Sequence, residues 1–138
     1  MRFMVMVKTK PGEEGPPTSE QIADMGRFNE ELVQAGVVTT GEGLMPSSMG
    51  AKVRFSKSGT TVIDGPFSEA KELVGGFWIF DVKSKEEALD WVRKIPFDEG
   101  EVEVRQIAEV EDFAVDEVSA EALEKEREWR DKGWRQPQ

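Results

Sequence analysis

The segment from Val62 to Trp78 places a sharp turn between two apolar runs, which constrains the fold more than any other part of the chain. Asp64-Gly65-Pro66 is turn chemistry, because Asp can bond its own backbone, Gly can adopt a positive φ and Pro fixes φ near about −65°. One strand is therefore predicted to end at Asp64 and another to begin at Gly76. Both runs have the composition of interior strands, so the turn should place charged side chains beside a sheet.

Two helices are predicted from capping patterns and apolar spacing. Thr18 with Gln21 forms a capping-box pattern, and Gly36 is the expected C-cap. Ser84 with Glu87 forms a second capping-box pattern, which predicts the start of the second helix. The side chains expected to face the core are Ile22, Met25, Phe28 and Leu32 in the first helix, then Ala88, Trp91, Val92 and Ile95 before Pro96.

The remaining apolar runs predict strands at residues 3–7, 37–40, 51–55, 60–63, 76–82 and 101–110. A loop of about four residues joins the third and fourth as a hairpin. This order predicts an α+β, ferredoxin-like βαββ(β)αβ fold, with an antiparallel sheet and its helices on one face. The other face would be a large apolar surface, so we expect a homodimer that covers it.

The domain is predicted to span residues 1–110, followed by a C-terminal helical extension over residues 111–138. Ser119 is the expected N-cap of a helix from Ala120 to Lys132. An isolated helix of this length is marginal in water. Trp129 and Trp134 are therefore expected to dock it on the body or on a partner subunit.

Composition excludes several classes of function. The formal charge of −10 argues against a nucleic-acid partner, because phosphate binding requires a basic patch. No apolar run is long enough to span a bilayer, and the lack of cysteine fits a cytoplasmic setting. The chain has no histidine, the commonest general base and metal ligand near neutral pH. No zinc site can therefore be built, and any chemistry must use carboxylates, amines or hydroxyls. A carboxylate-only site could hold Mg²⁺ or Ca²⁺, but no EF-hand-like ligand spacing appears, so we expect no metal and no cofactor.

The predicted catalytic residues are carboxylates near the central turn. Asp64 would be the base or ligand anchor, with Glu42 and Glu69 as secondary acids. The alternative for Asp64 is a carboxylate that only closes its own turn. The predicted substrate-binding residues are Arg54, Phe67, Lys71, Glu72 and Trp78.

Each of these binding residues also has a plain structural interpretation. Glu69 and Glu72 with Lys71 could be a solvated charge cluster, or a pair of acids held by a cation if the segment is helical. Arg54 could be an ion-pair partner of Asp64 or Glu42, and Trp78 could be a core residue.

Asp64-Gly65-Pro66-Phe67, followed by Gly75-Gly76 and an apolar strand, resembles the DGPF-motif branch of the YCII-related proteins. The resemblance continues at Gly41-Glu42-Gly43-Leu44 and covers about Met1 to Glu109. It implies a dimeric α+β barrel of ferredoxin-like subunits. Some relatives in the wider superfamily are small-molecule enzymes, one of them dehalogenating, with a proposed His–Asp acid/base pair. That pair does not carry over to a chain without histidine.

The sequence leaves two functions open. The first is a homodimer that binds a small molecule at the turn and carries out lyase- or isomerase-like chemistry. The second is a non-enzymatic binding or regulatory module. DGPF-type proteins are often encoded near extracytoplasmic-function sigma factors, so the resemblance implies a link to transcriptional control and a related protein partner.

Overall fold

The computed structural model describes residues 1–135, and the chain divides into two compact units, Met1–Gln106 and Ile107–Gln138. A four-stranded sheet of order β2-β5-β1-β6 is the centre of the first unit. All its neighbouring strands are antiparallel. The strands are β1 (Arg2–Thr9), β2 (Val38–Gly43), β5 (Leu73–Asp81) and β6 (Glu101–Gln106).

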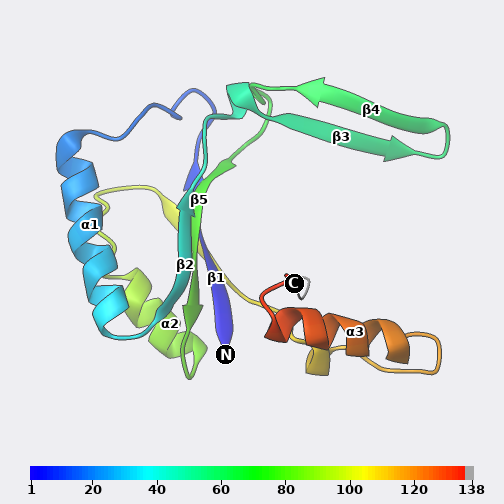
Figure 1. Ribbon diagram of the computed structural model, residues 1–138. Coiled ribbons are helices and arrows are strands. Elements are labelled where there is room, and N and C mark those ends of the chain that lie inside the picture. Colours follow the sequence, from blue (N-terminus) through cyan, green and yellow to red (C-terminus); the bar gives the residue numbers. More distant parts are fainter. Residues whose placement is uncertain (136–138) are drawn as a thin grey trace. The chain divides into compact units, whose positions relative to one another are not determined.

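Two helices, α1 (Ser19–Gln34) and α2 (Lys85–Val92), lie on one side of this sheet (Figure 1). The path β1-α1-β2 followed by β5-α2-β6 is the ferredoxin-like arrangement. The predicted α+β fold class is confirmed. No helix within residues 1–135 is both long enough and apolar enough to cross a membrane.

Helix α1 is capped as its sequence predicts. The Thr18 hydroxyl accepts the Gln21 N–H at 3.1 Å, and the Gln21 side chain accepts the Thr18 N–H at 2.9 Å. At the other end Gly36 has φ of 69°, and the Val37 N–H donates to the Leu32 carbonyl at 3.0 Å. This is a Schellman ending, which satisfies carbonyls that the helix leaves without a partner.

Helix α2 forms half of its predicted capping box. The Ser84 hydroxyl accepts the Glu87 N–H at 3.2 Å. The Glu87 carboxylate accepts the Lys83 N–H at 2.9 Å instead of the N–H of Ser84. The helix ends at Val92, ahead of Pro96, because Pro96 has no N–H to donate to the Val92 carbonyl in a continued helix and its ring would clash with that carbonyl.

The core lies between the sheet and the two helices. Ile22 is an exception to the prediction for α1, because its side chain is exposed and the buried stripe begins at the partly buried Met25. The buried core residues are Phe3, Val5, Phe28, Leu32, Val37, Trp78, Phe80, Val82, Ala88 and Ile95.

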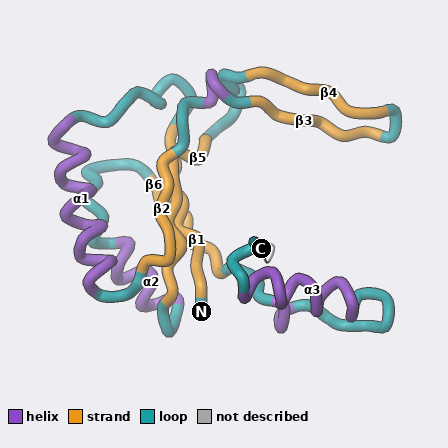
Figure 2. Tube along the Cα trace, viewed as in Figure 1, coloured by secondary structure: helices purple, strands orange, loops and turns teal. Residues whose placement is uncertain are grey.

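The hairpin of β3 (Ala51–Ser56) and β4 (Gly59–Asp64) is a separate two-stranded sheet (Figures 1 and 2). The prediction that the run before Asp64 is an interior strand is wrong. Each strand has two edges, and those of β1 and β5 are already occupied within the four-stranded sheet, so no interior place remains for β4. Lys57-Ser58 connects the strands, which makes the loop shorter than predicted.

The second unit contains the short helix η2 (Val110–Asp112) and α3 (Ala120–Asp131). Strand β6 ends at Gln106, before the strand end predicted at residue 110. Arg127 pairs with Glu111. The pKa of the Glu111 carboxyl is lowered, first by a hydrogen bond from the Glu111 backbone and then by one from the Arg127 side chain. Arg130 lies 3.2 Å from Glu109 and 2.8 Å from Glu126. The pairs with Glu111 and Glu109 hold α3 to the segment before it, whereas Glu126 lies within α3.

Ser119 is the N-cap of α3, but its hydroxyl bonds to Asp116 and does not cap the helix backbone. Trp129 and Trp134 are both exposed, with ring centroids 6.2 Å apart. That these rings dock the extension on another surface stays a prediction.

Candidate functional site

The central turn packs its backbone directly on the segment around the 3-10 helix η1 (Ser47–Met49). The Gly65 N–H donates to the Gly50 carbonyl at 2.9 Å, and the Gly65–Pro66 peptide is cis. A Cβ on Gly65 would lie 1.7 Å from the Ser47 carbonyl oxygen. Gly65 does not have a positive φ, contrary to the sequence expectation. Glycine is needed here because two backbones approach too closely for any side chain.

The Asp64 carboxylate does not close this turn. Asp64 is exposed at the end of β4, opposite Ala51. Its side chain makes no hydrogen bond or ion pair with any residue in the described part of the chain. The interpretation of Asp64 as a turn-closing acid is therefore wrong, because backbone groups and Ser47 supply that closure.

Glu14, in the loop after β1, clasps Ser47. One carboxylate oxygen accepts the Ser47 N–H at 2.9 Å, and the other accepts the Ser47 hydroxyl at 2.6 Å. The same hydroxyl accepts the Phe67 N–H at 3.4 Å. Hydrogen bonds to an ionised carboxylate are stronger than neutral ones. The Glu14–Ser47 clasp thus joins the loop after β1, η1 and the central turn.

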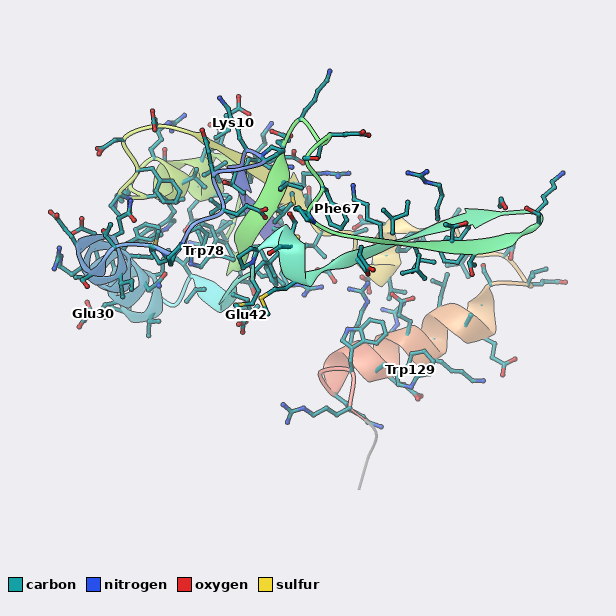
Figure 3. The ribbon with its side chains drawn as sticks, turned by 90° about the horizontal axis from the view of Figure 1, so that it is seen from above. Lys10, Glu30, Glu42, Phe67, Trp78 and Trp129 are labelled. Carbon is teal, nitrogen blue, oxygen red and sulfur yellow. The ribbon has the colours of Figure 1, made fainter. Side chains whose placement is uncertain are left out.

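A cavity of about 360 Å³, half open to solvent, lies beside the Glu14–Ser47 clasp. Its only charged lining residue is Glu14, and the rest of the wall is proline, glycine, serine and the Phe67 ring. Figure 3 shows Phe67 at the base of the hairpin, where the Lys52 ammonium lies 4.3 Å from its ring centroid. The lining residues are Pro11, Gly12, Glu14, Gly15, Pro46, Ser47, Ser48, Pro66, Phe67 and Ser68.

Phe67 is the one predicted site residue that lines this cavity. Asp64 and Arg54 lie on the hairpin, and Glu42 is exposed on β2. Glu69 is exposed in a turn. Within residues 1–135, Arg54 forms an ion pair with neither Asp64 nor Glu42. The predicted acids are therefore not brought together around the cavity.

The acidic cluster after the turn is organised by a lysine that the sequence analysis did not single out. Lys71 and its neighbours are not helical, so Glu72 and Glu69 do not share a helix face. Glu72 lies 3.6 Å from the Lys8 ammonium, which also lies 3.3 Å from Glu103. The Lys8 side chain is only 16% exposed. Lys8, from β1, is thus the cation that joins Glu72 and Glu103.

Trp78 is a core residue. Its indole N–H donates to the Asn29 side-chain oxygen at 2.9 Å, and its ring meets the Phe28 ring edge-on at a centroid distance of 5.8 Å. Figure 3 shows it on the side of the sheet that carries α1. The predicted substrate-binding role of Trp78 has no support in this geometry, because the ring and its polar atom are both occupied.

Glu14→Ala is expected to lower the free energy of unfolding by about 1–3 kcal/mol, because the partly buried Ser47 N–H loses its acceptor. Urea denaturation followed by circular dichroism measures this loss. The control is Asp64→Ala, expected to stay within about 0.5 kcal/mol of wild type because its carboxylate has no partner among the described residues. A larger loss for Asp64→Ala than for Glu14→Ala would contradict the assignment of the clasp.

Comparison with known proteins identifies the family of this chain. The YCII-related domain matches residues 1–111. An uncharacterised protein from Rhizobium meliloti (strain 1021) is 36% identical over 88 residues, which is 62% of this chain and 71% of the relative. The solved 5-chloro-2-hydroxyhydroquinone dehydrochlorinase from Burkholderia phenoliruptrix AC1100, in complex with 2,5-dihydroxybenzoquinone, aligns with a TM-score of 0.42 and 15% identity. That alignment covers 79% of this chain and 95% of the dehydrochlorinase. Because the domain match extends over most of the sequence, the chain belongs to the YCII-related family.

Proposed function

We propose that this protein is a homodimer that binds a small molecule in the cavity beside Pro66-Phe67-Ser68. The cavity itself is the observation that carries the proposal. Its volume of about 360 Å³ falls within the range of about 300–1,000 Å³ that small-molecule sites occupy. Its walls come from three segments that the Glu14–Ser47 clasp fastens together. A fastened wall loses little conformational freedom on binding.

The lining favours a neutral or cationic ligand. An anion would meet the Glu14 carboxylate in a chain whose formal charge is −10, and the lining contains no cationic side chain. The Phe67 ring and the proline rings offer apolar contact area. The molecule expected here therefore has an apolar body and no carboxylate or phosphate group.

Glu14 is the carboxylate available for lyase- or isomerase-like proton transfer on such a molecule. Each Glu14 oxygen accepts one hydrogen bond from Ser47 and retains acceptor capacity for a proton or a ligand donor. Glu14 takes the place of Asp64, Glu69 and Glu42 in this proposal, because those acids do not line the cavity.

Protein-observed NMR with a fragment library tests this function. Binding fragments are expected to shift the backbone amides of Gly12, Gly15 and Ser48, and neutral or cationic fragments should outnumber anionic ones. Ser48→Trp places bulk in the cavity wall and should abolish binding, whereas Ser58→Trp in the exposed hairpin turn should not. Fragments that bind Ser48→Trp as well as wild type would refute the site.

Catalysis is tested separately from binding. Each binding fragment is incubated with wild type and with Glu14→Gln, and its conversion is followed by NMR over time. Conversion by wild type that Glu14→Gln abolishes while binding persists supports proton transfer by Glu14. Equal conversion by both proteins would exclude that role.

A second candidate is a non-enzymatic module that binds another protein, including one linked to an extracytoplasmic-function sigma factor. The exposed apolar side chains of the second unit favour it. Its test is titration of the full chain with a purified sigma factor of this class, and binding unchanged by Trp129→Ala would contradict it. The exposed apolar side chains of the second unit that favour this candidate are Phe113, Val115, Val118, Trp129 and Trp134.

A further inference from the structure

The hairpin β3–β4 has no packing partner within the unit Met1–Gln106. It pairs with no other described strand, and all its residues from Ala51 to Val62 are exposed. An isolated two-stranded hairpin is marginally stable in water and needs a hydrophobic surface to pack against. Exposed edges and exposed apolar side chains also make such a hairpin prone to association. The hairpin is therefore an element that requires a partner.

One face of the hairpin is apolar. The register places Val53 opposite Val62 and Phe55 opposite Thr60. Side chains alternate between the faces of a strand, so these four residues share one face. Val53 is 50% exposed, Val62 65% and Phe55 78%. The face combines three large apolar side chains that the chain itself leaves in water.

The charge of the hairpin identifies the partner. Residues 51–63 contain Lys52, Arg54 and Lys57 and no Asp or Glu, so this segment carries +3. The total is −10, so the remainder of the chain carries −13. Complementary charge steers encounter and disfavours wrong partners. A second copy of this acidic chain is thus a partner to which the basic hairpin is attracted.

The base of the hairpin holds it in place. The Gly65 N–H bonds to the Gly50 carbonyl at 2.9 Å, which ties the two ends of the hairpin together. Figure 1 shows the hairpin extending to the side of the sheet opposite α1 and α2. A pre-positioned arm loses little freedom on association, which favours binding.

The sheet face on that side offers an apolar surface with an acidic border. Met6 lies opposite Phe77 and Met4 opposite Ile79, on the face away from the buried Phe3 and Val5. On β6, Glu101 and Glu103 lie beside Lys8 and Met6 on the same face. The centre of this sheet face is therefore apolar, like the Val53, Phe55 and Val62 face of the hairpin, and the acids at its border add to the negative charge of the chain.

We propose that β3–β4 is a dimerisation arm that packs its Val53, Phe55 and Val62 face on the open sheet face of a second copy. Lys52 and Arg54, which alternate onto the other face of the hairpin, add long-range attraction to the acidic partner without pairing across this contact. The inference rests on the homodimer proposed above but does not depend on the ligand cavity.

Sedimentation equilibrium of the full chain tests the arm. Wild type is expected to have twice the mass of one chain, and its dimer should weaken at high salt because salt screens the attraction between the basic hairpin and the acidic chain. Val62→Asp is expected to raise the dimer dissociation constant at least about tenfold. Val33→Asp on α1 is the matched control, because Val33 is also 65% exposed and should leave the dimer unchanged.

Circular dichroism of each variant shows whether it folds, and the double variant Lys52→Glu/Arg54→Glu gives a second measurement that leaves the apolar face intact. It too should weaken the dimer. A monomeric wild type at all salt concentrations would overturn the arm, as would a dimer that neither hairpin variant weakens. Fragment binding measured on monomeric Val62→Asp separates the two proposals, because the cavity can retain its ligands when the arm has lost its partner.

Discussion

Gly65→Ala is expected to lower the free energy of unfolding by about 3 kcal/mol or more, the largest effect of a single methyl group in this chain. The added Cβ would lie 1.7 Å from the Ser47 carbonyl oxygen and 2.7 Å from its carbonyl carbon. Both are backbone atoms, so no side chain can rotate away to relieve the contact. The segments that carry Ser47 and Pro66 must separate, which also opens the wall of the cavity.

Gly43→Ala is the control for this substitution. Gly43 lies in β2, has no positive φ, and a Cβ there would meet nothing within 4 Å. Its alanine variant should be as stable as wild type or slightly more so, because alanine reduces the freedom of the unfolded chain. Urea denaturation of both variants decides the comparison, and fragment binding should be lost only in Gly65→Ala. Equal stability of the two variants would refute the close approach at Ser47.

Phe80→Ala is expected to cost about 3–5 kcal/mol by leaving a cavity at the centre of the core. Phe80 is 0% exposed on β5, where it lies opposite Phe3 on β1 and Val38 on β2. Its ring centroid is 6.3 Å from that of Trp78. The surrounding strands are fixed by their ladders, so they cannot collapse into the space that the ring leaves.

The control for Phe80→Ala is Phe97→Ala, because Phe97 lies after α2 and is exposed. Its loss should cost less, about 1–2 kcal/mol, since Phe97 is already 41% exposed. Thermal unfolding followed by circular dichroism measures both. A cost for Phe97→Ala that matches or exceeds that of Phe80→Ala would place the core elsewhere.

Features that depend on a few neighbouring residues could be predicted from the sequence. The capping box of Thr18 and Gln21 and the left-handed Gly36 are local, because each involves groups within one helical turn. The order of strands and helices follows from periodicity, and that order admits the ferredoxin-like sheet. The same local reasoning identified the turn at Asp64-Gly65-Pro66. It expected Gly65 to have a positive φ, whereas the glycine is needed because the backbone of Ser47 lies so close.

The candidate site could not be predicted in the same way. Glu14 and Ser47 are 33 residues apart, and no spacing rule connects an acid in one loop with a serine in another. Glu72 pairs with Lys8 rather than with the adjacent Lys71, because the sheet brings β1 beside the start of β5. Proximity in sequence suggested a cluster of Glu69, Lys71 and Glu72. In the folded chain Lys8 instead joins Glu72 and Glu103.

The sequence by itself determined the elements of this protein, their order and their capped ends, because hydrogen bonds and apolar periodicity act over a few residues. Only the tertiary structure decided that β3–β4 stands outside the sheet, that Asp64 has no described partner and that Glu14 lines the cavity. The physical reason is that strand edges and polar groups compete for partners across the whole chain. The outcome of that competition depends on contacts between residues far apart in the sequence.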